Sequence, residues 1–218
     1  MKFHWKVSVF GAALTLTSAL ALADTIQIGS YQTGGPTLGN NNTAVAFVGT
    51  PSTTFALDPG GVWASAGPGS VWVSNNAGSG PTGSVTEPSG TYSYTTTFTT
   101  LAGNTYTGSI SVLADDTTSV IFNGHTLVAL NTAGPFPHCA TYQPNCLTPL
   151  LVTLPTADFL TGLNTLEFDT FQDVANSGLD FYGSAIGTSG VIPEPSTLML
   201  LGTGLFGAAG VLMRKRLA

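Results

Sequence analysis

Between residues 24 and 190, apolar and polar side chains alternate in short runs, and no run shows a helical period. In Thr91–Thr99 this alternation sends Tyr92, Tyr94 and Thr96 to one face. The runs are rich in Thr, Ser, Val, Tyr and Phe and are separated by Gly, Pro and Asn, which is typical of many short strands. The predicted strands are Thr25–Tyr31, Thr43–Val48, Ser70–Ser74, Thr91–Thr99, Gly108–Ala114, Thr118–Phe122, Thr126–Leu130, Leu150–Leu154, Thr165–Phe171 and Leu179–Ile186.

One predicted turn is especially clear. Asn123-Gly124 separates two apolar runs, and both residues tolerate the positive φ of a type I′ hairpin. Short strands without interleaved helices indicate an all-β domain over residues 24–186, an antiparallel β-sandwich or jelly roll. Asn75–Gly90 is predicted to be a long loop, and residues 187–192 a short flexible spacer.

The first 23 residues have the pattern of a secretory signal peptide. Lys2 and Lys6 precede an apolar run, and the small residues Ala21 and Ala23 occupy the −3 and −1 positions before Asp24. Such a signal implies the Sec translocon and signal peptidase as partners. A membrane anchor is the alternative, and the short apolar core argues against it.

The C-terminal segment 193–218 has three parts in order. The triplet Pro193-Glu194-Pro195 is followed by the uncharged run 196–213 and the cations Arg214, Lys215 and Arg216. As a helix this run measures about 27 Å, close to the thickness of a bilayer's hydrocarbon core. It is predicted to span the membrane, and the three cations should keep the C-terminus in the cytoplasm.

This order of triplet, Gly-rich apolar run and basic end resembles the PEP-CTERM protein-sorting signal of Gram-negative bacteria. The resemblance implies recognition by exosortase, a membrane-embedded cysteine protease or transpeptidase, and then release or transfer to the cell envelope. It also implies an association with exopolysaccharide and biofilm. A lasting C-terminal tail anchor is the alternative.

Charge is distributed unevenly along the chain. All five cations lie at the two ends, so residues 24–193 contain no Lys or Arg, whereas ten of the eleven acids lie there. A strongly anionic domain argues against nucleic acid and anionic lipid as partners. It also excludes Lys and Arg salt bridges, so sheet hydrogen bonds and apolar burial must hold the fold.

The order of several short motifs in the central region resembles galactose-binding-domain-like jelly rolls of bacterial surface proteins. These motifs are Trp63, Trp72, Gly90–Phe98, Ala114–Asp116, Phe122–Gly124, Gly162–Leu166 and Gly178-Leu179. The resemblance implies a jelly roll. That superfamily includes carbohydrate-binding modules, but many members bind no known sugar, and a fold alone does not give a function.

Cys139 and Cys146 are the only cysteines, and they flank a loop that contains Pro and Asn. In an exported chain they are expected to form a disulfide. A metal site that includes His138 is the alternative, although the spacing fits no common zinc pattern.

Two further ligand types are considered. Loop acids could hold calcium, with Asp115 and Asp116 as the favoured donors, although turn-forming Asp in solvent is the simpler interpretation. Trp63 and Trp72 are candidates for stacking on sugar, although large aromatic residues in a sandwich more often form the core.

No catalytic motif is present. The segment after residue 23 has two histidines and no Gly-x-Ser-x-Gly elbow or phosphate-binding loop. Glu167 and Asp169 could serve a hydrolase, but their spacing better fits one solvated strand face. The sequence therefore predicts a non-enzymatic surface or extracellular-matrix protein, with a carbohydrate-binding module as the second hypothesis and a secreted hydrolase as the third.

Overall fold

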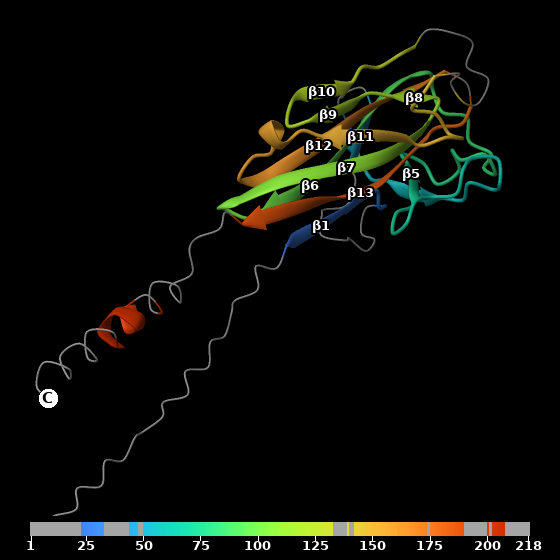
Figure 1. Cartoon of the computed structure of the whole chain (residues 1–218). Coiled ribbons are helices and arrows are strands. Elements are labelled where there is room, and N and C mark those ends of the chain that lie inside the picture. The colour runs from blue at the N-terminus through green and yellow to red at the C-terminus, as the bar shows by residue number, and fades with distance from the viewer. Residues whose placement is uncertain are drawn as a thin grey trace, which may run out of the picture. The chain divides into compact units, whose positions relative to one another are not determined.

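The computed structural model describes residues 23–32, 44–47, 50–132, 139, 142–173, 175–189, 200 and 202–207. Ala23–Gly190 forms one compact unit, and its described part is almost entirely β structure. Two antiparallel sheets face each other, so the expected all-β sandwich is confirmed (Figure 1).

The first sheet has the strand order β11-β7-β13-β5-β4, and β1 also pairs with β13. Its strands are β1 (Asp24–Gly29), β4 (Phe55–Leu57), β5 (Trp72–Ser74), β7 (Asn104–Asp115), β11 (Leu150–Leu154) and β13 (Gly178–Ser189). The long pair β7 and β13 forms its centre, in register from Asn104↔Ser189 to Asp115↔Gly178.

The second sheet has the order β10-β9-β12-β6-β2-β3, and β8 also pairs with β12. Its strands are β2 (Ala44–Phe47), β3 (Thr50–Ser52), β6 (Gly90–Thr100), β8 (Thr117–Thr118), β9 (Val120–Phe122), β10 (His125–Val128) and β12 (Gly162–Gln172). A short 3-10 helix, η1 (Thr156–Asp158), lies between β11 and β12.

The alternation of side chains builds the core between the sheets. Along β6 the buried positions include Tyr92, Tyr94, Thr96 and Phe98, which confirms the face predicted for this strand. The opposing residues from the first sheet include Ile110, Val112 and Phe181, and Phe181 stacks on Phe168 of β12 at a centroid distance of 4.4 Å. Removing these apolar surfaces from water is the main stabilising contribution to a fold without Lys or Arg.

The predicted hairpin is confirmed. Asn123 and Gly124 have φ values of 50° and 84°, and β9 pairs with β10 on either side of them. Each of the ten predicted strands overlaps an observed one; the predicted strand Thr118–Phe122 covers β9 and the end of β8, whereas β3 and β4 are not predicted. β13 extends to Ser189 because Gly187–Ser189 pair with Asn104–Tyr106, so the first half of the expected spacer at 187–192 is strand.

The C-terminal segment is described only at residue 200 and residues 202–207, which are helical. Within the part of the chain that the structure describes, no helix is long and apolar enough to cross a membrane. Most of the expected membrane-spanning run at 196–213 lies outside the described residues.

Candidate functional site

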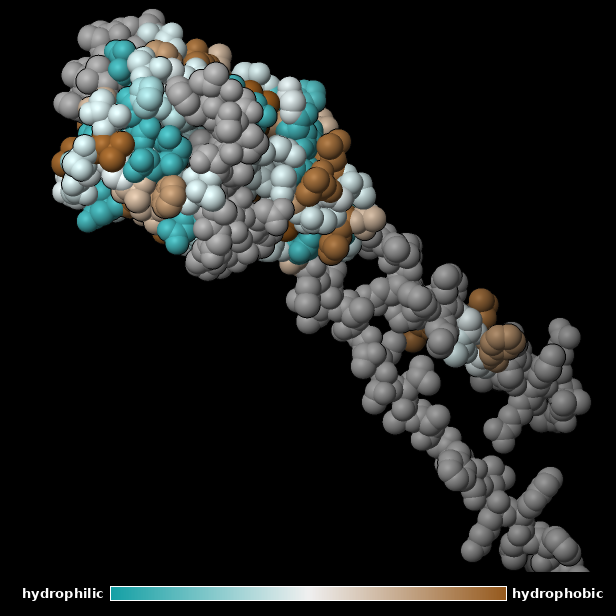
Figure 2. Space-filling view, turned by 180° about the vertical axis from the view of Figure 1, so that it is seen from behind, coloured by the Kyte–Doolittle hydropathy of each residue, from teal (hydrophilic) through white to brown (hydrophobic). Residues whose placement is uncertain are grey.

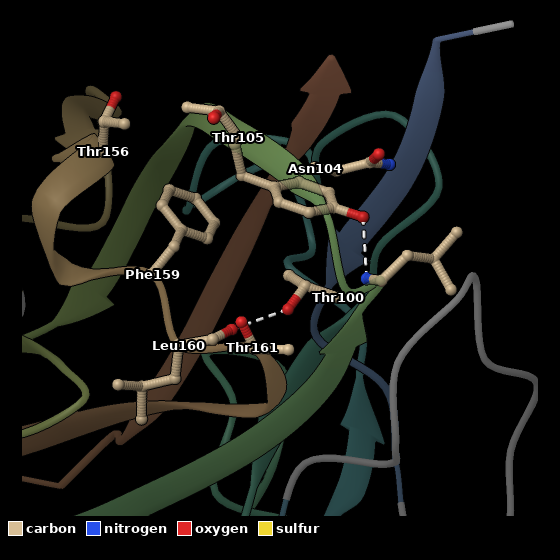
Figure 3. Close-up of a pocket in the computed structure, with 9 residues that line it drawn as sticks. Thr100, Asn104, Thr105, Thr156, Phe159, Leu160 and Thr161 are labelled. Carbon is tan, nitrogen blue, oxygen red and sulfur yellow. Dashed lines mark hydrogen bonds between the residues drawn. The ribbon is translucent and has the colours of Figure 1, made fainter. Parts of the chain in front are cut away.

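The sandwich has a hollow at the end where β6 turns into β7 and where η1 leads into β12 (Figure 3). Its volume is about 150 Å³. The lining residues are uncharged and mostly carry hydroxyl, amide or aromatic groups: Thr100, Leu101, Asn104, Thr105, Tyr106, Thr156, Phe159, Leu160 and Thr161. The same end of the domain carries Asp24, where β1 begins, and Ser189, where β13 ends.

A buried asparagine fixes the loop on one side of the hollow. The Asn164 side chain is fully buried; its Oδ1 accepts from Leu160 N at 2.9 Å, and its Nδ2 donates to the carbonyl oxygens of Leu160 and Gly162, each at 2.9 Å. Asn123 Nδ2 donates to Asn164 Oδ1 and to Asp158 O, both at 2.8 Å. The hairpin turn and the η1–β12 loop are therefore tied together by side-chain amides.

The hydroxyl groups of two lining residues are also used within the protein. Thr100 Oγ1 donates to Leu160 O at 2.6 Å (Figure 3). Tyr106 Oη accepts from Leu101 N at 2.9 Å and donates to the Asp24 carboxylate. The walls of the hollow are thus held in place without any ligand.

An aromatic cluster anchors the apolar part of the hollow. Phe159 is half-buried, and its ring stacks on Tyr106 with centroids 5.8 Å apart. It also meets Phe122 edge-on at 4.9 Å. Because these neighbours fix the ring, Phe159 presents a preformed aromatic surface at the hollow (Figure 3).

The rim of the hollow carries side chains with unused hydrogen-bonding capacity. Thr105, Thr156 and Thr161 are exposed, and Asn104 is half-buried. None of these four side chains hydrogen-bonds to another residue that the structure describes. Figure 2 shows that, on the face in view, hydrophobic residues of the sandwich occur in small groups between hydrophilic ones.

The acids predicted as calcium donors lie at the opposite end of β7. Asp115 and Asp116 are fully buried, so the expectation that these residues are turn-forming acids in solvent is wrong. Asp116 Oδ2 accepts from Asp173 N at 2.8 Å, whereas neither carboxylate oxygen of Asp115 has a hydrogen-bond partner among the described residues. Burial raises the pKa of Asp115 to about 9, and the charge of Asp116 adds to this effect.

Asp180 shows how this fold satisfies a buried carboxyl group elsewhere. Its oxygens accept from Ser30 Oγ and from Gly67 N, each at 2.9 Å. Burial raises the pKa of Asp180, and these hydrogen bonds oppose the rise. Among the described residues, no group donates to Asp115 with ordinary hydrogen-bond geometry, and only the Trp63 side chain opposes the rise in its pKa.

Calcium at Asp115 and Asp116 stays a prediction. The described residues contain no group of three or more His, Cys, Asp or Glu side chains that could hold a metal. Six to eight oxygen ligands would be needed, so amide, hydroxyl, carbonyl or water oxygens would have to complete the shell.

The two tryptophans considered for sugar stacking are buried. Trp63 is 3% exposed and Trp72 is fully buried, and their ring centroids lie 4.5 Å apart. Trp72 Nε1 donates to Ala64 O at 2.9 Å. Together with Leu57, Leu113 and Cys146 they form a second apolar cluster, so neither ring offers a face to a sugar.

The expected disulfide between Cys139 and Cys146 is present, with Cα atoms 5.4 Å apart. Its loop is fastened to the domain, because Ala64 N donates to Cys146 O at 2.8 Å and Ala114 N donates to Asn145 O at 3.2 Å. The disulfide thus covers the Trp63–Trp72 cluster near the end of β7.

Replacing both cysteines by serine is expected to lower the free energy of unfolding by about 2–3 kcal/mol, because the short loop gains entropy in the unfolded chain. Urea unfolding with and without a thiol reductant measures this change. Reductant should lower the stability of the natural protein and leave the double variant unchanged. Equal stability of the two proteins without reductant would contradict the prediction.

Of the residues predicted for processing, only Ala23 is described; it is exposed and precedes β1. Ala21, Pro193, Glu194, Pro195, Arg214, Lys215 and Arg216 lie outside the described residues. A family model described as the PEP-CTERM protein-sorting motif matches residues 191–216. No curated protein matches the chain. The chain therefore carries a PEP-CTERM sorting motif directly after its β-sandwich domain.

Proposed function

We propose that this protein is exported, sorted by exosortase through its C-terminal motif, and delivered as a non-enzymatic component of the cell surface or extracellular matrix. The observation that carries this proposal is the PEP-CTERM sorting motif at residues 191–216. The motif suggests an exported, envelope-associated protein with exosortase as its processing partner.

Two features of the β domain support an extracytoplasmic location. The Cys139–Cys146 disulfide is a bond that persists in oxidising compartments. The domain also lacks Lys and Arg, and the three C-terminal cations follow the apolar run. Under the positive-inside rule, we infer that the tail is transiently anchored in the inner membrane with its C-terminus in the cytoplasm.

Our proposal of a matrix role rests on the family resemblance and on the surface chemistry of the domain. A cation-free, acidic sandwich repels nucleic acid and anionic lipid, whereas an uncharged exopolysaccharide meets no such repulsion. We propose this polymer environment as the destination of the processed protein.

Intact-mass measurement of protein recovered from the native cell tests the sorting proposal. We expect a species that begins at Asp24 and ends near Pro193–Pro195. Replacing Pro193, Glu194 and Pro195 together by alanine should leave the tail attached, because exosortase would no longer recognise it. A full-length C-terminus at steady state in the natural protein would show that the tail is a permanent anchor.

The matched control for this experiment is Thr188→Ala with Ser189→Ala. Both residues are exposed at the end of β13, a few positions before the triplet. The control should be processed like the natural protein. Loss of processing in the control as well would mean that the chain around the triplet, and not the triplet itself, is recognised.

A further inference from the structure

The hollow at the β6–β7 end of the sandwich has features that the sorting motif does not explain. Its walls are fixed by internal hydrogen bonds, whereas its rim carries hydroxyl and amide groups that have no hydrogen-bond partner among the residues that the structure describes. A site with fixed walls and free polar groups can bind a ligand with little loss of conformational entropy.

The chemistry of the rim restricts the ligand. Thr105, Thr156 and Thr161 each offer a hydroxyl group that both donates and accepts, and the Asn104 amide does the same through separate atoms. These groups match a ligand whose own hydroxyl groups both donate and accept. The aromatic ring of Phe159 adds a surface for an apolar C–H face.

Charge restricts the ligand further. No charged side chain lines the hollow. The neighbouring elements carry Asp24, whose carboxylate accepts from Tyr106, and Asp158 of η1, whose carboxylate lies 3.9 Å from His125 Nδ1. In the full chain used for the test, where the Asp24 nitrogen is an uncharged amide, these carboxylates disfavour an anionic ligand, and the lining supplies no carboxylate for a cation.

Size limits the ligand to a single small ring. Pockets for drug-sized ligands measure roughly 300–1,000 Å³, whereas this hollow measures about 150 Å³. An extended peptide would seek a free strand edge, which the lining does not provide.

We propose that this hollow binds one neutral pyranose unit, as a free sugar or at the end of a glycan. The ring would lie against Phe159, and its hydroxyl groups would bond to Thr156 and Thr161 on one side and to Asn104 and Thr105 on the other. This inference goes beyond the sorting proposal and holds whether or not the tail is processed.

The test titrates the full chain, in a detergent without a sugar headgroup, with the neutral methyl glycosides of glucose, galactose, mannose and N-acetylglucosamine. Ligand-observed NMR should show saturable binding of at least one glycoside, with a Kd on the order of 1–10 mM for so small a site. Methyl glucuronide, which carries a carboxylate, should bind at least about tenfold more weakly because of Asp24 and Asp158.

Variants locate the site. Thr156→Ala with Thr161→Ala should weaken binding by about tenfold, since two hydrogen bonds are lost. Phe159→Leu, which keeps an apolar side chain in the aromatic cluster, should weaken binding by removing the aromatic face. The matched control is Thr91→Ala with Thr126→Ala, two exposed threonines outside the lining, which should bind like the natural protein.

The proposal fails if no neutral glycoside saturates the protein below about 100 mM, if the glucuronide binds as well as the neutral sugars, or if the rim variant binds as tightly as the control. Each variant is first checked for an unchanged unfolding midpoint. Failure of sugar binding would leave the sorting proposal intact, because processing is measured separately by mass.

Discussion

The variant Asp115→Asn should be more stable than the natural protein at pH 8, by about 2–4 kcal/mol. The natural side chain is fully buried, neither of its oxygens accepts a hydrogen bond of ordinary geometry from a described residue, and it lies beside a second buried acid. No Lys or Arg exists in the domain to compensate its charge. Asparagine keeps the size of the side chain and is neutral at every pH, so its folding does not require the uptake of a proton that Asp115 needs at pH 8.

The pH dependence follows from the raised pKa of Asp115, which is about 9 in the folded protein. An unfolded Asp titrates near pH 4, so above that pH the unfolded chain has lost a proton that the folded protein retains. Stability therefore falls as pH rises from about 4 to about 9, and the fall is complete above the folded pKa. The two proteins should be similarly stable at pH 4 and diverge as pH rises.

Urea unfolding at intervals between pH 4 and 9, in EDTA, measures this difference. The matched control Asp173→Asn changes an exposed acid near the same site and should alter stability by less than about 0.5 kcal/mol. A natural protein that becomes more stable between pH 5 and 8 in EDTA would contradict the prediction.

Adding calcium to the same samples tests the cation predicted for Asp115 and Asp116. If calcium binds, mass action should raise the unfolding midpoint of the natural protein at pH 8. The midpoint of Asp115→Asn should rise much less, because a carboxylate ligand is lost. Identical unfolding midpoints with calcium and with EDTA would show that calcium does not bind at Asp115 and Asp116.

The β-sandwich could be predicted because its strands and its clearest turn are indicated by residues that are close together in the sequence. Period-two alternation in runs such as Thr91–Thr99 and the Asn123-Gly124 turn are readable without any knowledge of the partner strands. The unpredicted strands β3 and β4 have only three residues each, too few to show an alternation by themselves. The extension of β13 to Ser189 depends on its pairing with Asn104–Tyr106, which lie far away in the sequence.

The candidate site was harder to predict because it combines segments that lie far apart in the sequence. The hollow combines the β6–β7 turn with the η1–β12 loop, and no sequence motif connects Asn104 with Thr161. The disulfide was predictable because only two cysteines exist. One signal for the hollow could have been used, namely the polar Asn164 at an inward position of β12, before Leu166 and Phe168.

The environment of Asp115 was also hidden in the sequence. Two adjacent acids before a hairpin are usually solvated turn residues. Here two other segments pack at the same end of β7, namely the one that contains Trp63 and the disulfide loop. The Asp115 side chain is 0% exposed as a result. Burial depended on these distant segments, which carry no pattern that indicates where they pack.

Asn164→Ala should lower the free energy of unfolding by about 3 kcal/mol, because buried amide and carbonyl groups lose their partners. The Leu160 N–H loses its acceptor, and the carbonyl oxygens of Leu160 and Gly162 each lose a donor. Since these bonds hold the η1–β12 loop, the variant should also lose the hollow. Urea unfolding measures the first effect, and glycoside titration measures the second.

Asn104→Ala is the matched control for Asn164→Ala, because the same residue type lines the same hollow and its side chain makes no hydrogen bond to another described residue. It should change stability by less than about 0.5 kcal/mol and still weaken sugar binding. A stability loss equal to that of Asn164→Ala would mean that the rim, and not the buried amide, holds the loop. The pair thus separates the residue that builds the hollow from one that would contact a ligand. Replacing Asn164 should change both the free energy of unfolding and sugar binding, whereas replacing Asn104 should change sugar binding alone.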